Sequence, residues 1–575
     1  MSIWFLPLLI VGAAIALAIP LGLYLAWILD GRYRPPRWLR WVEQRVDTGP
    51  QNGKQYTLAL LFFNVVIFVF GFAVLALQPL LPLNPDGKTM LCPSTIFHTV
   101  CSFLSNTNQQ HYSGEVHLSY FSQLFAICWN QFVTPAVGLS ALAAIVRGLR
   151  GDRDMGNFYI DLWRSAIYIL LPLAFFLGVL LMAGGIPMTF EGAAQAAIVE
   201  PGADGQPTVF QTLSRGPVAA VVAIKQLATN GGGFFAANSC HPFENPTAWT
   251  NFLECLSIVL LPMACLVMFG RMLRDFRQAA VIFAVMLLLS TATIVWAVYF
   301  DTMQPNPALA ALPVDPSLGN LEGKELRFGT SAGTTWAALT TNTSNGSVNA
   351  MHDSLNPLAG LAPLAGMWLN CIWGGVGVGL INFLIYLIVG VFLAGLMVGR
   401  TPEYLGKKVE AREMKLAMLA LLIHPLMVLL PTGLFAALDW GTKTTTNPGP
   451  HGFSEILYEF SSASANNGSG FEGLADTYGL NDNKDRPTYA IYWDIACGLV
   501  LVISRFIPII APIAIAGSLA AKKPTPFTAG TMRTDTVTFG FVLLGTILLV
   551  GALLFMPAAV LGPIAEHLGP IPFGQ

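Results

Sequence analysis

The sequence predicts an all-α polytopic membrane protein with about ten transmembrane helices. Two features of its composition support this fold class: 54% of the 575 residues are apolar, and only 11% are charged. Soluble domains carry about 25% charged residues, so this chain has too few charges to cover a water-exposed surface. The composition excludes a cytosolic enzyme, a disordered chain and a nucleic-acid-binding protein. We therefore expect the lipid bilayer to surround the chain, with no nucleic-acid partner.

Apolar segments long enough to cross a bilayer recur along the whole chain, since one helix needs about 20 residues. They lie at 3–28, 57–82, 119–146, 162–186, 247–270, 278–300, 370–398, 414–438, 490–518 and 536–558. Basic residues follow the first segment and do not precede it, which is the reverse of a cleaved signal peptide. We expect this segment to remain as a helix whose N-terminus lies outside.

Lysine and arginine are unevenly divided between the two sides of the predicted bundle. With the N-terminus outside, 21 of the 30 basic residues fall in cytoplasmic loops and 8 in outer segments. The remaining one, Arg505, lies inside a span. Because basic residues concentrate on the cytoplasmic side, this division predicts that both termini lie outside.

Four polar strings rich in Gly, Asn, Thr and Ser lie in the outer segments, at 105–110, 228–233, 341–347 and 464–469. With Asn108, Gly232, Gly346 and Gly468 taken as their centres, they are 124, 114 and 122 residues apart. Short apolar stretches precede them, at 93–103, 216–227, 334–339 and 453–460, and these predict helices too short to span. The regular spacing predicts four copies of a helix–re-entrant loop–helix unit.

Non-helical backbone at membrane depth is tolerated where it is buried in protein or lines a watery cavity. Four such loops on one axis would form a ring of backbone carbonyls that replaces the water shell of a monovalent cation. One such string alone is more often a surface turn, but four at matched spacing favour an ion path. The predicted ion-binding residues are Asn106, Thr107, Asn108, Thr229, Asn230, Gly231, Gly232, Thr343, Ser344, Asn345, Gly346, Ala465, Asn466, Asn467 and Gly468.

The predicted organisation is four M1–pore helix–selectivity filter–M2 repeats around one pore, with one extra helix at each end. The N-terminal helix is expected within 1–30 and the C-terminal helix within 534–558. The four repeats are expected at 57–148, 160–275, 277–399 and 413–520.

Several longer motifs carry a family resemblance. The segment 230–247 reads NGGGFFAANSCHPFENPT, 113–115 reads SGE, 399–408 reads GRTPEYLGKK and 516–520 reads AGSLA. These motifs resemble those of the potassium-binding subunits (KdpA) of bacterial Kdp potassium-transporting ATPases, and the resemblance runs from about the first helix to the last. The sequence departs from the family pattern at Gln109, Ala237, Cys240 and Asn345, which bears on affinity and selectivity.

The resemblance implies a function. A chain of this family takes potassium from the outside through its filter and delivers it through an intramembrane tunnel to a P-type ATPase catalytic subunit. Two small accessory membrane subunits complete such a complex, in the bacterial inner membrane. The chain has neither a G-x-x-x-x-G-K-[ST] string nor an Asp-Lys-Thr-Gly phosphorylation motif. We therefore expect a transport subunit that is not an enzyme by itself and binds potassium but no nucleotide.

The resemblance also assigns residues to the ion path below the filter. The glycine-rich segment 374–379 is expected to break the third M2 helix, forming a gate at Gly375, Gly377 and Gly379; a small-residue packing face is the alternative. Gln110 is also predicted as a gating or ion-path residue. In related transporters an arginine on the last M2 helix opposes free flow, a role implied for Arg505. An ion pair with Asp494 or a snorkelling side chain is the alternative.

Two other functions stay open at this stage. A self-contained potassium channel or cation symporter of the same superfamily would pass ions directly to the cytoplasm. A secondary transporter for an organic solute is disfavoured, because such folds use twofold repeats. His241, Glu244 and His424 are interpreted as structural residues.

Overall fold

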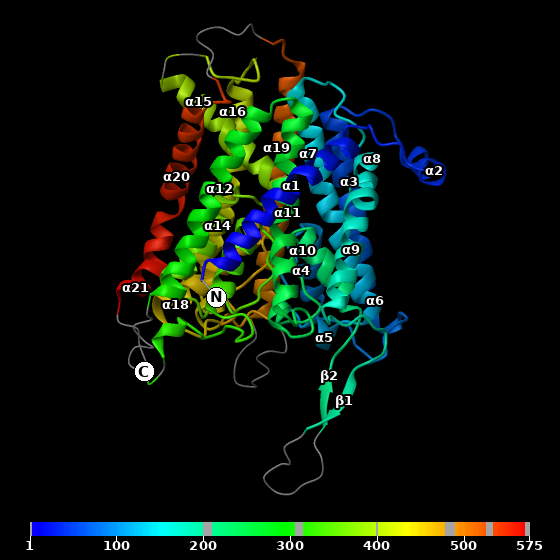
Figure 1. Cartoon of the computed structure of the whole chain (residues 1–575), viewed down its shortest axis with the longest axis vertical. Helices are drawn as coiled ribbons and strands as arrows, with labels where there is room; N and C mark the ends of the chain where they lie inside the picture. The colour runs from blue at the N-terminus through cyan, green and yellow to red at the C-terminus, as the bar shows by residue number, and fades with distance from the viewer. Residues whose placement is uncertain are drawn as a thin grey trace, which may run out of the picture.

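The computed structural model describes residues 3–198, 210–304, 313, 315–397, 399, 401–477, 489–524 and 533–569. Arg400, Lys484 and Arg486, which were counted in the charge distribution, lie outside these residues. Within the described part, ten helices are long and apolar enough to cross a membrane. They stand side by side in one bundle (Figure 1). The prediction of an all-α polytopic membrane protein is therefore confirmed.

Six of the ten spans are single helices: α1 (Phe5–Leu29), α3 (Gly53–Ala76), α11 (Ala248–Leu273), α15 (Val378–Met397), α16 (Ala411–Ala437) and α19 (Ala490–Ala521). The other four include π-helical turns. Helix α6 (Tyr120–Ser122) runs through Gln123–Cys128 into α7 (Trp129–Arg150), and α8 (Phe158–Trp163) runs through Arg164–Leu170 into α9 (Leu171–Ala183). Helix α12 (Phe276–Val298) continues into Tyr299–Met303. The last joins α20 (Val537–Ala559) through Val560–Ile564 to α21 (Ala565–Leu568).

Four of these helices form the inside of the bundle. In α7, α11, α15 and α19 between 67% and 94% of the most apolar window is buried, against 33% to 44% in the other six spans. Contacts of α7 with α11, α11 with α15, α15 with α19 and α19 with α7 close an inner ring. The outer spans turn leucine, phenylalanine and valine outward, as lipid-facing helices do.

The third inner span differs from its prediction. The predicted span 370–398 is wrong at its start, because helix α14 (Pro357–Leu369) ends at Asn370 and α15 begins at Val378. Asn370, Gly374 and Gly377 have φ of +45°, +59° and +80°, which no right-handed helix accommodates. Hydropathy concealed the break because apolar residues such as Ile372 and Trp373 occupy the loop. The expected helix break within 374–379 is present.

Four short helices enter the bundle from one end without crossing it: α4 (Pro93–Leu104), α10 (Val218–Leu227), α13 (Thr330–Asn342) and α18 (Gly449–Ala465). They correspond to the four predicted pore helices, although α13 and α18 extend further at both ends than 334–339 and 453–460. All four are almost completely buried. Their C-terminal ends lead into the four polar strings.

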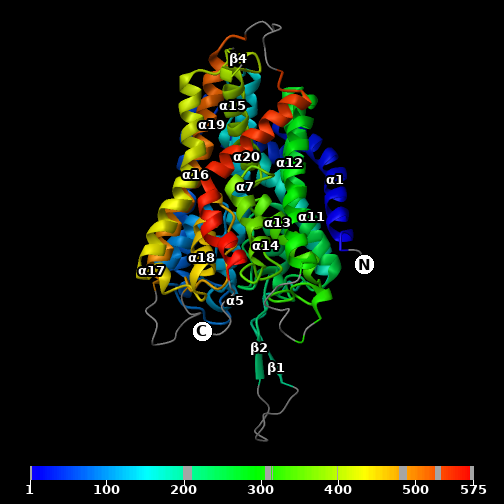
Figure 2. The ribbon, with the colours of Figure 1, turned by 90° about the vertical axis from the view of Figure 1, so that its left-hand side faces the viewer.

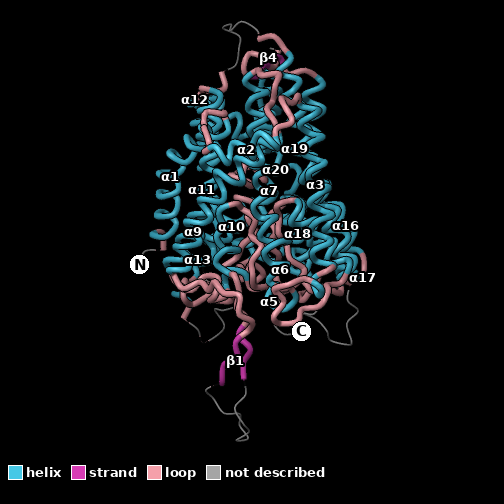
Figure 3. The backbone as a smooth tube through the Cα atoms, turned by 90° about the vertical axis from the view of Figure 1, so that its right-hand side faces the viewer, coloured by secondary structure: helices cyan, strands magenta, loops and turns pink. Residues whose placement is uncertain are grey.

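Two small antiparallel sheets mark opposite ends of the bundle (Figures 2 and 3). Strand β1 (Ala194–Ala197) pairs with β2 (Phe210–Leu213), and Ala194 lies opposite Leu213. Strand β3 (Glu403–Tyr404) pairs with β4 (Lys407–Lys408). The remaining short elements are α2 (Arg37–Val46), α5 (Gly114–His117), α17 (Asp439–Thr442) and the 3-10 turns Gln78–Leu80, Asn238–Cys240 and Pro316–Leu318. The end with β1 and β2 also holds α5, α17 and α18 (Figure 2).

Candidate ion-binding site

Each polar string leaves its short helix with two residues in the left-handed backbone conformation, separated by one residue. The pairs are Asn106 and Asn108, Thr229 and Gly231, Ser344 and Gly346, and Asn466 and Gly468, with φ between +48° and +109°. Non-glycine residues seldom adopt such angles, so one local irregularity could be chance. The same pair in all four loops is a fourfold repeat of backbone conformation.

This repeat corrects the register of the second string. Gly231, and not Gly232, is equivalent to Asn108, Gly346 and Gly468. The choice of Gly232 as the centre was wrong by one residue, because three consecutive glycines offer no side chain by which to align them. Gly232 instead lies beside Asn108, and its carbonyl oxygen accepts a 2.8 Å hydrogen bond from Gln131 Nε2.

The N–H groups of each loop turn back toward the end of the preceding short helix. The N–H groups of Asn230 and Gly231 donate to the carbonyl oxygen of Lys225, at 3.0 and 3.1 Å. Equivalent bonds run from Thr107 and Asn108 to the Ser102 carbonyl, from Asn345 and Gly346 to the carbonyl and hydroxyl of Thr340, and from Asn467 and Gly468 to those of Ser462. The backbone alternates between left-handed and other conformations, so successive N–H groups point to one side of each loop. The carbonyl oxygens point to the opposite side of the loop.

The residue between each left-handed pair supplies the candidate ion ligand. These residues are Thr107, Asn230, Asn345 and Asn467, and within the described chain their carbonyl oxygens accept no hydrogen bond. The four short helices also end at these loops, where the negative end of a helix dipole favours a cation. Four equivalent carbonyls without donors match the ligands of a dehydrated monovalent cation.

Backbone packing closes the four loops into a ring. A Cβ atom added at Gly231 would overlap the carbonyl oxygen of Asn345. In the same way, Gly346 is in close contact with the Asn467 carbonyl, and Gly468 with the Thr107 carbonyl. Gly232 completes the circle, because its added Cβ would lie 2.6 Å from the Cβ of Asn108. Loops two, three, four and one therefore meet in succession around one axis.

Side-chain amides join the same neighbours. Asn106 Nδ2 donates to the Thr229 carbonyl at 3.1 Å, and Asn466 Nδ2 donates to the Thr107 hydroxyl at 3.0 Å. Asn345 Nδ2 and Asn467 Nδ2 donate to the carbonyls of Lys225 and Thr340, at 3.2 and 3.0 Å. The unusual Asn345 thus serves as a brace between loops. Thr343 and Ala465, also predicted as ion-binding residues, lie at the ends of α13 and α18, where each loop begins.

A buried ionic network supports the second loop, and the sequence analysis did not predict it. Lys225 Nζ is ion-paired with Glu244 and donates to Asn238 Oδ1 and Ser239 Oγ at 2.7 and 2.8 Å. Asn238 Nδ2 in turn donates to the Gly231 carbonyl at 2.6 Å. Both Lys225 and Glu244 have no exposed surface. A lysine in a mostly apolar short helix, shortly before the motif 230–247, was the available signal.

Replacing Lys225 with methionine should therefore destabilise the chain by about 3–5 kcal/mol, because Glu244 would remain buried without its partner. The measurement is thermal unfolding of the purified protein in detergent. The double variant Lys225→Met/Glu244→Gln should recover part of the loss. Equal stability of the single variant and the wild type would contradict this role.

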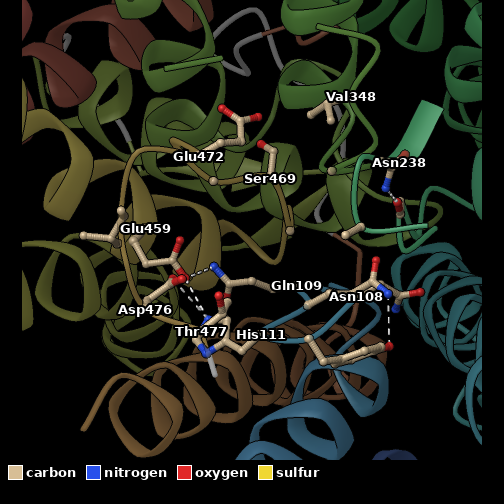
Figure 4. Close-up of a pocket in the computed structure, with 18 of the residues that line it drawn as sticks. Asn108, Gln109, His111, Asn238, Val348, Glu459, Ser469, Glu472, Asp476 and Thr477 are labelled. Atoms are coloured by element: carbon tan, nitrogen blue, oxygen red, sulfur yellow. Dashed lines mark hydrogen bonds and ion pairs between the residues drawn. The ribbon is translucent and has the colours of Figure 1, made fainter. Parts of the chain in front are cut away.

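Outside the ring lies a cavity of about 180 Å³. Its wall includes the second left-handed residue of every loop, namely Asn108, Gly231, Gly346 and Gly468. The carboxyl groups of Glu459, Glu472 and Asp476 also line it, and Figure 4 shows Gln109 and His111 beside Glu459 and Asp476. Gln109, a departure from the family pattern, donates to Glu459. The cavity is thus acidic and borders the ring.

His111 is the only basic side chain among the described residues that line this cavity. Its Nε2 lies 3.2 Å from Glu459 Oε1 and 3.5 Å from Asp476 Oδ2, and its Nδ1 lies 2.8 Å from Asp494 Oδ1. Burial lowers the pKa of His111, but the charges and hydrogen bonds of these carboxylates outweigh that effect and raise it. The described lining thus contains three carboxyl groups and one histidine, and this excess of acidic groups attracts cations.

The charge of the cavity should depend on pH through Asp476. Burial, followed by the effect of the Glu459 carboxyl, raises the pKa of Asp476 to about 7, although His111 acts in the opposite direction. This carboxyl is therefore mostly protonated at pH 6 and mostly ionised at pH 8. Burial also raises the pKa of Glu472, which lines the same cavity, to about 7. We expect the potassium affinity of the assembled complex to rise severalfold between pH 6 and pH 8, and Asp476→Asn to remove about half of that rise. A pH dependence unchanged in the variant would exclude Asp476.

Gln110, also predicted as a gating or ion-path residue, lines the cavity outside the ring. Its Oε1 accepts from the Gly233 N–H at 2.9 Å and its Nε2 donates to the Gly233 carbonyl at 3.1 Å, so it joins loops one and two. The other two departures lie outside the ring. Ala237 is exposed, and Cys240 Sγ donates to the Val348 carbonyl at 3.8 Å.

On the other side of the ring, the loop between α14 and α15 closes against loops two and three. The N–H groups of Trp373 and Gly374 donate to the Asn342 carbonyl at 3.0 and 2.8 Å, and the Val376 N–H donates to Thr229 Oγ1 at 2.9 Å. Gly377 is in close contact with the Gly138 carbonyl on α7. Gly375 faces Thr229 and Gly379 packs on Gly374. The predicted gate residues thus lie in a closely packed loop beside the ring, which is called the glycine plug below.

Arg505 lies beside this plug. It is 4% exposed, and among the described residues it has no hydrogen bond and no ion pair. A Cβ added at Gly138 would lie 3.6 Å from Arg505 Nη2 and would overlap the Val376 carbonyl. The alternative ion pair with Asp494 is absent, because Asp494 binds His111, Ser94 and Thr95. An enclosed charge without a partner is costly, and such residues mark ion paths.

Within the described residues, ten helices long and apolar enough to cross a membrane surround four loops that meet in a ring, and this architecture defines a polytopic membrane protein. The family model described as KdpA, potassium-transporting ATPase A subunit, matches residues 8–568. The chain therefore belongs to this family, as its motifs predicted.

Individual relatives agree with the family model. Proteins named potassium-transporting ATPase potassium-binding subunit are 49% identical in Pseudomonas aeruginosa (90% of this chain and 89% of that one) and 45% identical in Granulibacter bethesdensis (96% of both). The one from Geobacillus kaustophilus is 42% identical, over 96% of this chain and 97% of its own. Among solved structures, the potassium transporter TrkH from Vibrio parahaemolyticus matches with a TM-score of 0.48 and 12% identity, over 78% of this chain and 83% of that one.

Proposed function

We propose that this chain binds potassium from outside the cell in the four-loop ring. It then passes the ion through an intramembrane tunnel to the P-type ATPase catalytic subunit of an uptake complex. The complex also contains two small accessory membrane subunits and lies in the bacterial inner membrane, with both termini of this chain outside. The chain itself binds no nucleotide. One observation carries the proposal: the four equivalent carbonyl oxygens of Thr107, Asn230, Asn345 and Asn467, which accept no hydrogen bond within the described chain.

The proposed path has three stages. The acidic cavity raises the local concentration of cations. The ring replaces the water shell of the ion with neutral carbonyls, and the C-terminal ends of four helices stabilise its charge. Behind the ring, the glycine plug and Arg505 oppose direct passage to the cytoplasm, so the ion leaves sideways toward the partner subunit. Family membership supports the potassium specificity and the partner.

The test compares the assembled complex with the purified chain alone, each in sealed vesicles. ATP-dependent potassium uptake and potassium-stimulated ATPase activity are expected from the complex, with no flux through the chain alone. Rapid potassium flux through the chain alone would instead identify a self-contained channel. Flux that depends on a second ion gradient would identify a symporter.

A further inference from the structure

The short helix α2 projects sideways from the bundle, away from the four-loop ring (Figure 1). Helix α1 already ends at Leu29, followed by Gly31 with a φ of +74°, and α2 begins directly after Pro35 and Pro36. On a helix with 3.6 residues per turn, Leu39 and Glu43 lie on one side, and both are turned toward the bundle. The opposite side carries Arg37, Trp38, Trp41 and Arg45. The outward side of α2 is thus a stripe of two tryptophans and two arginines.

Two attachments fix the depth of α2 relative to the spans. Glu43 forms an ion pair with Arg164 at 2.9 Å, within the first turns of the span Phe158–Ala183. Just beyond α2, Asp47 Oδ1 and the Gly49 carbonyl accept hydrogen bonds of 2.9 and 2.8 Å from Asn157 Nδ2. Asn157 is the N-cap of that span. The helix is therefore held at the level where a transmembrane helix begins, which is the headgroup region of a bilayer.

The outward stripe is exposed, because no part of the described chain packs over it. Trp38 is 70% exposed and Trp41 is 57% exposed. Arg45 lies over the Trp41 ring at 4.6 Å, so the positive charge and the aromatic face are presented together. Arg37 has no ion pair within the described residues, and Glu43, the one acidic residue of α2, is used by Arg164. The stripe is therefore cationic as well as aromatic.

We propose that α2 is a membrane-interface helix that binds anionic phospholipid headgroups through Arg37 and Arg45. Trp38 and Trp41 lie at the same level, where tryptophan side chains prefer the boundary between acyl chains and water. Charge complementarity selects the occupant, because a headgroup with net negative charge attracts the two arginines more strongly than a zwitterionic headgroup, in which choline offsets the phosphate charge. This lipid site is independent of the proposed potassium path.

The test uses the assembled complex in phosphatidylcholine vesicles that contain a small fraction of brominated lipid, which quenches nearby tryptophan emission. The Trp38→Phe/Trp41→Phe variant isolates the emission of these two residues by difference from the wild type. We expect brominated phosphatidylglycerol to quench this difference emission about fivefold more effectively than brominated phosphatidylcholine. In Arg37→Gln/Arg45→Gln this preference should fall close to one, and Arg37→Lys/Arg45→Lys should restore it.

The matched control is Arg271→Gln/Arg412→Gln, which removes the same charge from exposed residues on the same predicted side. It should keep the wild-type preference. Potassium-stimulated ATPase activity of every variant reports whether the complex is intact, and we expect the α2 variants to retain it. Equal quenching by the two lipids in the wild type would overturn the headgroup assignment. Absence of quenching by either lipid would show that water or a protein partner covers the stripe, and would overturn the proposal.

Discussion

Replacing Gly231 with alanine should lower the potassium affinity of the assembled complex by about tenfold or more, which corresponds to about 1.4 kcal/mol. The new Cβ atom would overlap the Asn345 carbonyl, one of the four candidate ligands. Position 231 also has a φ of +81°, which costs an alanine about 1–2 kcal/mol. The loop cannot relax freely, because Asn238 and the Lys225 carbonyl hold it from behind. The readout is the potassium concentration that half-stimulates ATPase activity.

Matched variants separate a defect of the ring from a general loss of folding. Gly346→Ala should act in the same way, because its Cβ would overlap the Asn467 carbonyl. Gly12→Ala, in an outer helix with nothing within 4 Å of the added atom, should leave the affinity unchanged. An unchanged concentration dependence in both ring variants would show that ions do not bind at these carbonyls.

The sequence predicted the architecture well because membrane burial imposes strong local constraints. Runs of about 20 apolar residues had to be spans, and polar strings between them had to be enclosed by protein. The predicted boundaries of elements were wrong where the composition of a segment did not reveal its backbone conformation. Apolar residues fill the loop between α14 and α15, so hydropathy did not reveal it. The three glycines at 231–233 are identical in sequence but differ in backbone conformation.

The contacts that surround the ring could not be predicted in the same way. His111 meets Asp494, which lies 383 positions away along the chain, and no local pattern relates the two residues. The Lys225 network was closer to being predictable, because its partners Asn238 and Glu244 lie in one motif with the second loop. Which atoms of that motif meet depends on three-dimensional packing, and so Glu244 could be interpreted only as a structural residue.

Replacing Arg505 with alanine should let potassium leak passively through the complex in the absence of ATP. The guanidinium is enclosed beside the glycine plug and has no partner among the described residues, so its charge opposes a cation that has passed the ring. At 6 Å and an effective dielectric constant of 20, two unit charges repel by about 3 kcal/mol. Removing that barrier corresponds to an increase in flux on the order of a hundredfold.

Potassium efflux from vesicles loaded with the ion measures this leak directly. Arg505→Lys is the matched control, because it keeps the positive charge and should remain tight, whereas Arg505→Gln should leak like the alanine variant. The half-stimulating potassium concentration should change little in all three variants, since Arg505 lies behind the ring and not within it. Absence of a potassium leak from vesicles with Arg505→Ala would show that the glycine plug alone prevents direct passage. A leak in the lysine variant would mean that the shape of the guanidinium, and not its charge, blocks the path.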